Sequence, residues 1–206
     1  MAVSTDGPVP LLSVEEAQRA AASAGVPGAL ATLNVFRLLL RRQTLAKGVS
    51  DTLLSLLAGG ALDHRLRELA IMRIAWMTGS GYEWSQHWEI AQRFGIPAED
   101  LQAVRQGFAA TRLSEVERAA LDAVDQAVAG RTIAADTIAA LRRGLSDDAL
   151  IELVACIGCW SMVSTILRTF EVPLDEGLTS WPPDRTGPAA GDGLRDGPGS
   201  QRRPRD

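Results

Sequence analysis

The sequence lacks several features that would point to common functional classes. It has 2 cysteines in 206 residues, too few for a disulfide framework, which fits a reducing compartment. Its 21 basic residues are outnumbered by 25 acidic ones, and a net charge of −4 offers no attraction to a phosphate backbone. The N-terminus carries no export signal, and the longest apolar stretches, such as 53–62, are too short to cross a bilayer. We therefore expect a cytoplasmic protein that binds neither nucleic acid nor membrane.

Strand signals are also missing, whereas helical ones recur along the chain. No alternating apolar and polar run of strand length is present. Ser13-x-x-Glu16 and Ser114-x-x-Glu117 are capping boxes that open helices. Residues 64–77 are apolar nearly all round, which indicates a central, buried helix. The fold class is therefore predicted to be all-α, with helices over 14–24, 28–47, 51–57, 64–77, 82–94, 98–106, 115–129, 134–142 and 147–170.

A weak internal repeat divides the helical region. At an offset of 76 residues, a Trp-Ser pair, an Ile and an F-x-(aliphatic)-P motif recur, at Trp84, Ile90 and Phe94 and again at Trp160, Ile166 and Phe170. We expect one domain over 1–183, made of related units at roughly 28–110 and 111–183. Residues 184–206 are rich in Gly and Pro, with one Leu as the only large apolar side chain. This composition predicts a disordered tail.

A small set of titratable residues is the best candidate for chemistry. His87 lies four residues after Glu83, so the two share a helix face. Glu68 lies on the preceding helix, which a Gly79-Ser80-Gly81 break folds back against this one. We expect the imidazole and the two carboxyl groups to meet in one pocket that contains no sulfur. Such a cluster is suited to general acid/base catalysis.

The same residues also have a purely structural interpretation. Ser80-x-x-Glu83 is itself a capping box, and its side chains would then only satisfy backbone N–H groups. A histidine between apolar helices is often a satisfied core residue, and Glu68 could pair with His64 or Arg65 on its own helix. Spacing alone does not decide between the two interpretations.

The stretch RLRELAIMRIAWMTGSGYEWSQHWEIAQRFGIP resembles the carboxymuconolactone decarboxylase / alkylhydroperoxidase D superfamily, and the likeness extends over about residues 30–182. The family pattern is a Glu, a helix, and then Cys-x-x-Cys-x-x-x-His. The Glu falls on Glu68 and the His on His87, while the two cysteine positions hold Ser80 and Glu83. The resemblance implies an alkylhydroperoxidase D-like helical bundle that forms homo-oligomers, commonly trimers or hexamers.

The missing cysteines change the expected activity. Peroxide reduction in this family needs a thiolate that attacks and a second thiol that resolves the product as a disulfide. Ser80 and Glu83 can do neither. What remains resembles the decarboxylase branch, which implies a cofactor-independent lyase or isomerase acting on a small cyclic, aromatic-derived carboxylic acid or lactone. Loss of CO₂ beside a lactone carbonyl leaves a delocalised carbanion, so the chemistry requires no metal or organic cofactor, and we expect neither.

The candidate roles follow from that reaction. His87 is the proposed acid/base group, Glu68 orients it or relays its proton, and Glu83 is a second acid/base group if burial keeps it protonated. The candidate substrate contacts would donate a hydrogen bond to the enolate oxygen, form an aromatic wall beside a flat ring, and supply a positive charge that compensates the carboxylates. They are Tyr82, Trp84, Trp76, Arg73 and Ser80.

Two alternatives stay open. Cys156-x-x-Cys159 occupies the repeat positions of Ser80 and Glu83, so a thiol-dependent peroxidase is one. Its surroundings are apolar, and no cationic neighbour that would lower a thiol pKa is evident, which favours a buried structural pair. The pair also lacks the further ligands of a zinc site. The other alternative is a non-catalytic helical oligomer in which Glu68 and His87 are merely buried.

Overall fold

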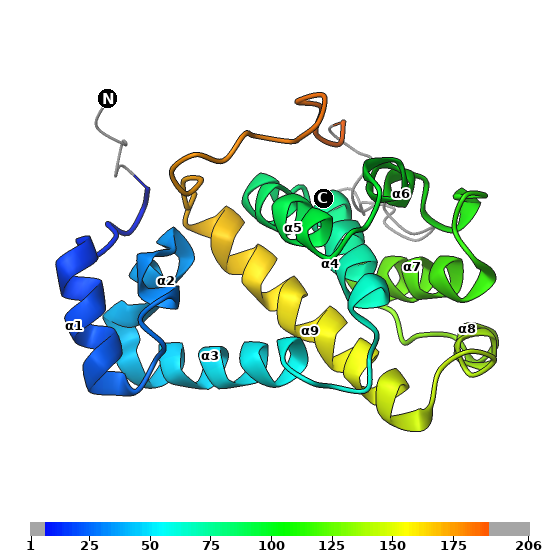
Figure 1. The fold of residues 1–206 in the computed structure, drawn as a ribbon, viewed down its shortest axis with the longest axis horizontal. Helices are drawn as coiled ribbons and strands as arrows, with labels where there is room; N and C mark the ends of the chain where they lie inside the picture. The colour runs from blue at the N-terminus through cyan, green and yellow to red at the C-terminus, as the bar shows by residue number, and fades with distance from the viewer. Residues whose placement is uncertain (1–6, 190–206) are drawn as a thin grey trace, which may run out of the picture.

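This computed structural model describes residues 7–189, and all of the regular secondary structure in that range is helical (Figure 1). The prediction of an all-α fold is confirmed. Short 3-10 helices cover Leu30–Thr32, Leu40–Arg42 and Val104–Ala109. The α-helices are α1 (Val14–Ala24), α2 (Asn34–Leu39), α3 (Gln43–Leu57), α4 (His64–Thr78), α5 (Gly81–Arg93), α6 (Ala98–Ala103), α7 (Glu115–Val128), α8 (Ala135–Leu141) and α9 (Asp147–Thr169).

Helix α4 lies at the centre, as its apolar sequence predicts. Every residue from Leu66 to Ala75 is buried. The helix packs against α5, α7 and α9, and its two sides contribute to different apolar clusters. A helix surrounded in this way is mostly apolar on every side, and each of its few polar side chains needs a partner inside the protein.

The turn between α4 and α5 brings the candidate residues together. Gly79 ends α4 with a positive φ of 70°, a conformation that costs glycine little. The N–H of Ser80 donates to the carbonyl of Ala75 at 2.9 Å, and α5 begins at the next residue. The predicted fold-back of the helix that carries Glu68 onto the helix that carries His87 is confirmed.

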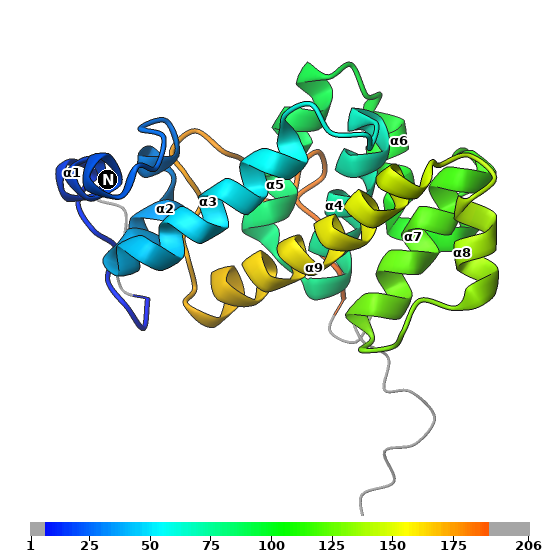
Figure 2. The ribbon, with the colours of Figure 1, turned by 90° about the horizontal axis from the view of Figure 1, so that it is seen from below.

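The N-terminal helices differ from the prediction. A single helix over 28–47 is wrong, and so is a separate helix over 51–57. The backbone is extended at Leu33 (φ −73°, ψ 135°) and leaves the helical region at Arg42 (φ −126°, ψ 82°), whereas α3 runs unbroken from Gln43 to Leu57. The breaks change the chain direction so that α1, α2 and α3 form a layer beside α9 (Figures 1 and 2). They share an apolar cluster with Tyr82, Val163 and Leu167.

The two copies of the F-x-(aliphatic)-P motif make the same turn. The N–H of Ile96 donates to the carbonyl of Ala91 at 3.1 Å, and that of Val172 donates to the carbonyl of Leu167 at 2.9 Å. The residues before them, Gly95 and Glu171, both have positive φ, 77° and 50°. The boundaries of the two related units stay a prediction.

The segment after α9 runs back across α5 (Figure 1). The indole N–H of Trp84 donates to the carbonyl of Pro182 at 2.8 Å, and the N–H of Trp181 donates to Ser85 Oγ at 3.2 Å. Asp184 pairs with Arg105 at 2.8 Å, although it lies in the range whose composition predicts disorder. Residues 190–206 of the predicted tail lie outside the described residues.

By length and composition, α9 is apolar enough to cross a membrane, and it is the one helix in the described range that passes this test. The most apolar 18-residue window within it is 44% buried inside the protein. Its inner face belongs to two of the apolar clusters, so part of this hydropathy is that of a core helix.

Candidate active site

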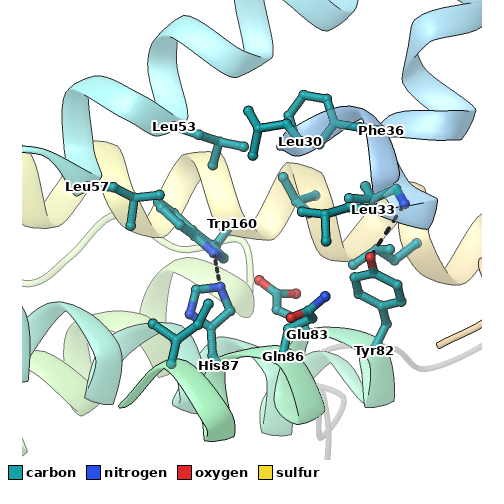
Figure 3. A pocket seen from close by; sticks show the side chains of 14 residues that line it. Leu30, Leu33, Phe36, Leu53, Leu57, Tyr82, Glu83, Gln86, His87 and Trp160 are labelled. Atoms are coloured by element: carbon teal, nitrogen blue, oxygen red, sulfur yellow. Dashed lines mark hydrogen bonds between the residues drawn. The ribbon is translucent and has the colours of Figure 1, made fainter. Parts of the chain in front are cut away.

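A cavity of about 170 Å³ lies between the N-terminal layer, α5 and α9. Figure 3 shows Leu30, Leu53 and Leu57 on one side, with Glu83 and His87 facing them from α5. The lining is almost wholly apolar and includes no Lys or Arg. Its members are Leu30, Leu33, Val35, Phe36, Leu53, Leu57, Tyr82, Glu83, Gln86, His87, Ile90, Trp160, Val163 and Leu167. The volume suits a single small ring.

The predicted pair of Glu68 and His87 is present. His87 Nδ1 lies 2.7 Å from Glu68 Oε2, and Glu68 is completely buried behind the imidazole rather than in the pocket lining. Arg67 Nε donates to Glu68 Oε1 at 3.2 Å. Burial acts to raise the pKa of Glu68, but His87 and the Arg67 guanidinium outweigh it and hold that pKa below its usual value. Glu68 is therefore a buried carboxylate, and Arg67 compensates its charge.

Trp160 holds the other side of the imidazole. Its indole N–H donates to His87 Nε2 at 3.0 Å (Figure 3). An indole N–H can only donate, so Nε2 is an acceptor and carries no proton. The proton then sits on Nδ1 and is donated to Glu68. The arrangement fixes which ring nitrogen donates and which accepts, with both nitrogens engaged.

Glu83 is the second carboxyl group of the pocket, and it is protonated near neutral pH. Its side chain is 2% exposed, and burial raises its pKa to about 8, although the Ser164 hydroxyl, which donates to Oε2, and the nearby Ser80 hydroxyl act to lower it. Its other oxygen, Oε1, has no hydrogen-bond partner among the described residues. No charged group lines the pocket beside it. Glu83 can therefore present a proton to a molecule in the cavity.

Tyr82 lines the pocket, but its hydroxyl is engaged elsewhere. It donates to Asp175 Oδ2 at 2.5 Å and accepts from the N–H of Val35 at 3.5 Å. Asp175 also accepts from Gln86 and from the N–H of Asn34. Burial and the Asp175 carboxylate raise the pKa of Tyr82. The tyrosine thus links α5 to α2 and to the C-terminal segment, and only its ring faces the cavity.

Four predicted substrate contacts lie outside the pocket lining. Trp76 and Trp84 form a cluster with Trp181, away from the cavity, so they do not wall it. Arg73 forms an ion pair with Asp125 at 2.6 Å and also donates to two backbone carbonyls, which uses its charge within the protein. These placements follow from helix rotation: the face of α5 that carries Trp84 points to the core opposite the face that carries Glu83 and His87.

Ser80 is the fourth of these residues. It is buried and makes no capping hydrogen bond to α5, and its hydroxyl has no partner among the described residues. The predicted capping box of Ser80 and Glu83 is therefore wrong. The Glu83 carboxyl turns toward Ser164 on α9 instead of the helix N-terminus.

Cys156 and Cys159 are both free and buried, and neither lines the cavity. Burial is the largest influence on both thiols and raises the pKa of each; the Glu68 carboxylate adds to it at Cys156, and the Glu83 carboxyl group adds to it at both. Raised thiol pKa values are the opposite of what a reactive cysteine needs. In the described part of the chain, no group of three or more His, Cys, Asp or Glu residues could hold a metal ion.

Sequence reasoning missed Trp160, Ser164 and Arg67 as parts of this cluster. Trp160 was visible only as a repeat match to Trp84, and in the structure the two indoles have different partners. Ser164 is a lone polar residue on the inner face of an apolar helix, a signal that could have indicated it. Arg67 directly precedes Glu68 and is 2% exposed.

The fold and the site together define an all-helical protein with a buried carboxylate–imidazole–indole cluster and a protonated glutamate at one small apolar cavity. Residues 43–126 match the carboxymuconolactone decarboxylase family. This match covers the stretch in which the sequence resembles the carboxymuconolactone decarboxylase / alkylhydroperoxidase D superfamily. Comparison with curated proteins finds no match.

Solved structures share the fold. The core of alkylhydroperoxidase AhpD, an uncharacterised peroxidase-related protein from Ralstonia eutropha, is 17% identical with a TM-score of 0.66, over 82% of this chain and 93% of that one. The debrominase Bmp8 in complex with 2,3,4-tribromopyrrole is 19% identical with a TM-score of 0.62, over 83% and 95%. A protein of unknown function from Agrobacterium tumefaciens is 22% identical with a TM-score of 0.57, over 62% and 88%. These likenesses concern the fold.

Proposed function

We propose that this protein is an enzyme that transfers a proton to or from carbon on a small, mostly apolar ring compound, as a lyase of the decarboxylase type or as an isomerase. The observation that carries the proposal is Glu83. It is a carboxyl group inside an apolar cavity, its pKa is raised to about 8, and one of its oxygens has no partner among the described residues. A neutral acid in such a place is suited to protonating a carbanion.

His87 serves as the base of the proposed reaction. A substrate that enters between the imidazole and the indole displaces their hydrogen bond. The Trp160 N–H then becomes a donor for a ring carbonyl oxygen, and Nε2 becomes free to take a proton. Glu68 compensates the imidazolium that forms, because its carboxylate is already bonded to Nδ1.

The lining also suits decarboxylation of a ring acid. A carboxylate in an apolar cavity without a cation is poorly solvated, whereas the charge of the transition state is spread over the ring carbonyl, so the barrier falls. In the lyase form the carbon–carbon bond breaks, CO₂ leaves, and the electron pair delocalises onto the lactone carbonyl. The carbon then takes the Glu83 proton, and solvent later restores that proton. The debrominase Bmp8, which shares the fold, binds a small ring compound, 2,3,4-tribromopyrrole, in its solved complex. The proposed step itself needs no cofactor.

The proposal is tested with a panel of small cyclic ketones, lactones and carboxylated lactones in D₂O. Deuterium gain by a substrate that loses no CO₂ indicates isomerase-type proton transfer, and release of CO₂ indicates the lyase. We expect Glu83→Gln and His87→Ala to abolish either signal while circular dichroism remains helical. Glu89→Gln, an exposed glutamate of the same helix, is the matched control and should keep the signal. Equal turnover by the wild type and both pocket variants would refute the proposal.

A further inference from the structure

The outward face of α9 is apolar and uncovered. Ile151, Val154 and Met162 are 67%, 43% and 40% exposed, which places them among the few large apolar side chains at the surface of the described chain. The exposed positions recur at alternating spacings of four and three residues, the pattern of a coiled-coil seam. The seam consists of Ile151, Ala155, Gly158, Met162 and Thr165.

Gly158 lies at the middle of this seam, and nothing within the chain requires a glycine at this position. A glycine inside a long helix destabilises it relative to alanine. A Cβ at position 158 would meet no described atom within 4 Å, so packing inside the protein does not require the glycine. Close approach of a second backbone would require it.

We propose that α9 packs antiparallel against α9 of a second copy of this chain, with Gly158 on the two-fold axis. Ile151 lies seven residues before Gly158 and Thr165 seven residues after, so each faces the other across the contact. The same symmetry brings Asp147, in the first turn of α9, to the level of the partner copy's last turn, which carries Arg168. Asp147 is exposed and also pairs with Arg142 of its own chain at 2.6 Å. A parallel pairing would instead bring like charges together at both ends.

Apolar side chains that flank the seam on both sides of α9 enlarge the surface available for contact. On one side, a groove is formed by Ile133 and Ile138 beside Val154. On the other side, Leu45, which is 51% exposed, borders a groove with Phe170. The most apolar window of α9 is 44% buried within one chain, and pairing of two copies buries much of the remainder.

The contact lies on the back of the candidate site. Trp160 and Ser164, on the inner face of the same helix, contact His87 and Glu83. The pairing contributes no residue to the cavity, and its test does not depend on any catalytic activity.

Cysteine cross-linking tests the axis directly. In the Gly158→Cys variant the two new thiols meet on the two-fold axis, and mild oxidation should join two chains into one band on non-reducing gels. The Thr165→Cys variant is the matched control. In the antiparallel pair its two thiols are about 21 Å apart along the helices, too far for a disulfide. The native thiols are buried and stay outside the reaction.

A second arm keeps the proposal testable if cysteine at the axis disturbs the contact. Mixing the Ile151→Cys and Thr165→Cys chains should give a mixed disulfide at least tenfold faster than either chain gives alone. The wild type should sediment as an even multiple of 22.0 kDa, and Met162→Glu should weaken the association at least tenfold.

Several outcomes overturn the proposal. One is cross-linking of Thr165→Cys with itself, which indicates a parallel or random contact. Another is failure of both Gly158→Cys and the mixed pair to cross-link. A third is a wild type that sediments as a monomer or an isolated trimer. The last is a monomer that instead co-sediments with phosphatidylcholine vesicles, which would assign the face to a membrane.

Discussion

Replacing Glu83 with glutamine should change how the stability of the fold depends on pH. In the folded protein the pKa of Glu83 is raised to about 8, against an ordinary value of 4.5. A carboxyl group with a raised folded-state pKa stabilises the fold while it is protonated in both states, and this contribution is lost as the pH rises from about 4.5 through 8. The shift of about 3.5 units corresponds to roughly 5 kcal/mol in full. Between pH 6 and pH 9 the linkage relation gives a loss of roughly 2–3 kcal/mol.

The assay is urea unfolding followed by circular dichroism at half-unit steps from pH 6 to pH 9. We expect the free energy of unfolding of the wild type to fall across this range by about 2–3 kcal/mol more than that of Glu83→Gln. A glutamine cannot ionise, and its amide oxygen can still accept from Ser164. Glu89→Gln, at an exposed site on the same helix, should follow the wild type.

Parallel curves for the wild type and Glu83→Gln would refute the reasoning. They would mean that Glu83 ionises alike in the folded and unfolded chains and that it is no proton donor at neutral pH. A steeper curve for the variant would have the same meaning, because the sign of the linkage would be reversed.

Three further predictions concern the groups around the imidazole and on α9. Trp160→Phe removes the indole donor and leaves Nε2 of the imidazole unpaired, so we expect a loss of about 1–3 kcal/mol in the free energy of unfolding, measured by urea unfolding. Nδ1 keeps its proton because the Glu68 carboxylate still accepts it, and an unchanged free energy of unfolding would contradict the prediction. Arg67→Met leaves a buried carboxylate without its cation and should cost about 3–5 kcal/mol, measured by urea unfolding, whereas a loss below about 1 kcal/mol would show that the ion pair contributes little. Cys156 and Cys159 should react with a thiol reagent only after denaturation, and millimolar peroxide should leave both titratable; rapid loss of thiol in the folded state would support the peroxidase alternative.

The sequence by itself determined the helices outside the N-terminal layer and the meeting of α4 with α5. Helix periodicity, the capping boxes at Ser13 and Ser114, and the left-handed glycine at position 79 act over a few residues, so a linear sequence displays them. The pairing of Glu68 with His87 follows from the short turn between their helices and from the family spacing. The breaks at Leu33 and Arg42 could not be predicted from the sequence, because they depend on how the N-terminal helices pack against α9.

Only the tertiary structure decided what the site can do. Trp160 reaches His87 across 73 positions of sequence, and its indole N–H engages Nε2, the imidazole nitrogen opposite the one that is bonded to Glu68. Burial by the N-terminal layer and α9 keeps Glu83 protonated, since desolvation is a property of the assembled cavity and not of any local pattern. The rotation of α5 about its axis directed Trp84 to the core and Glu83 to the cavity, and residue spacing alone does not specify which face of a helix meets which neighbour.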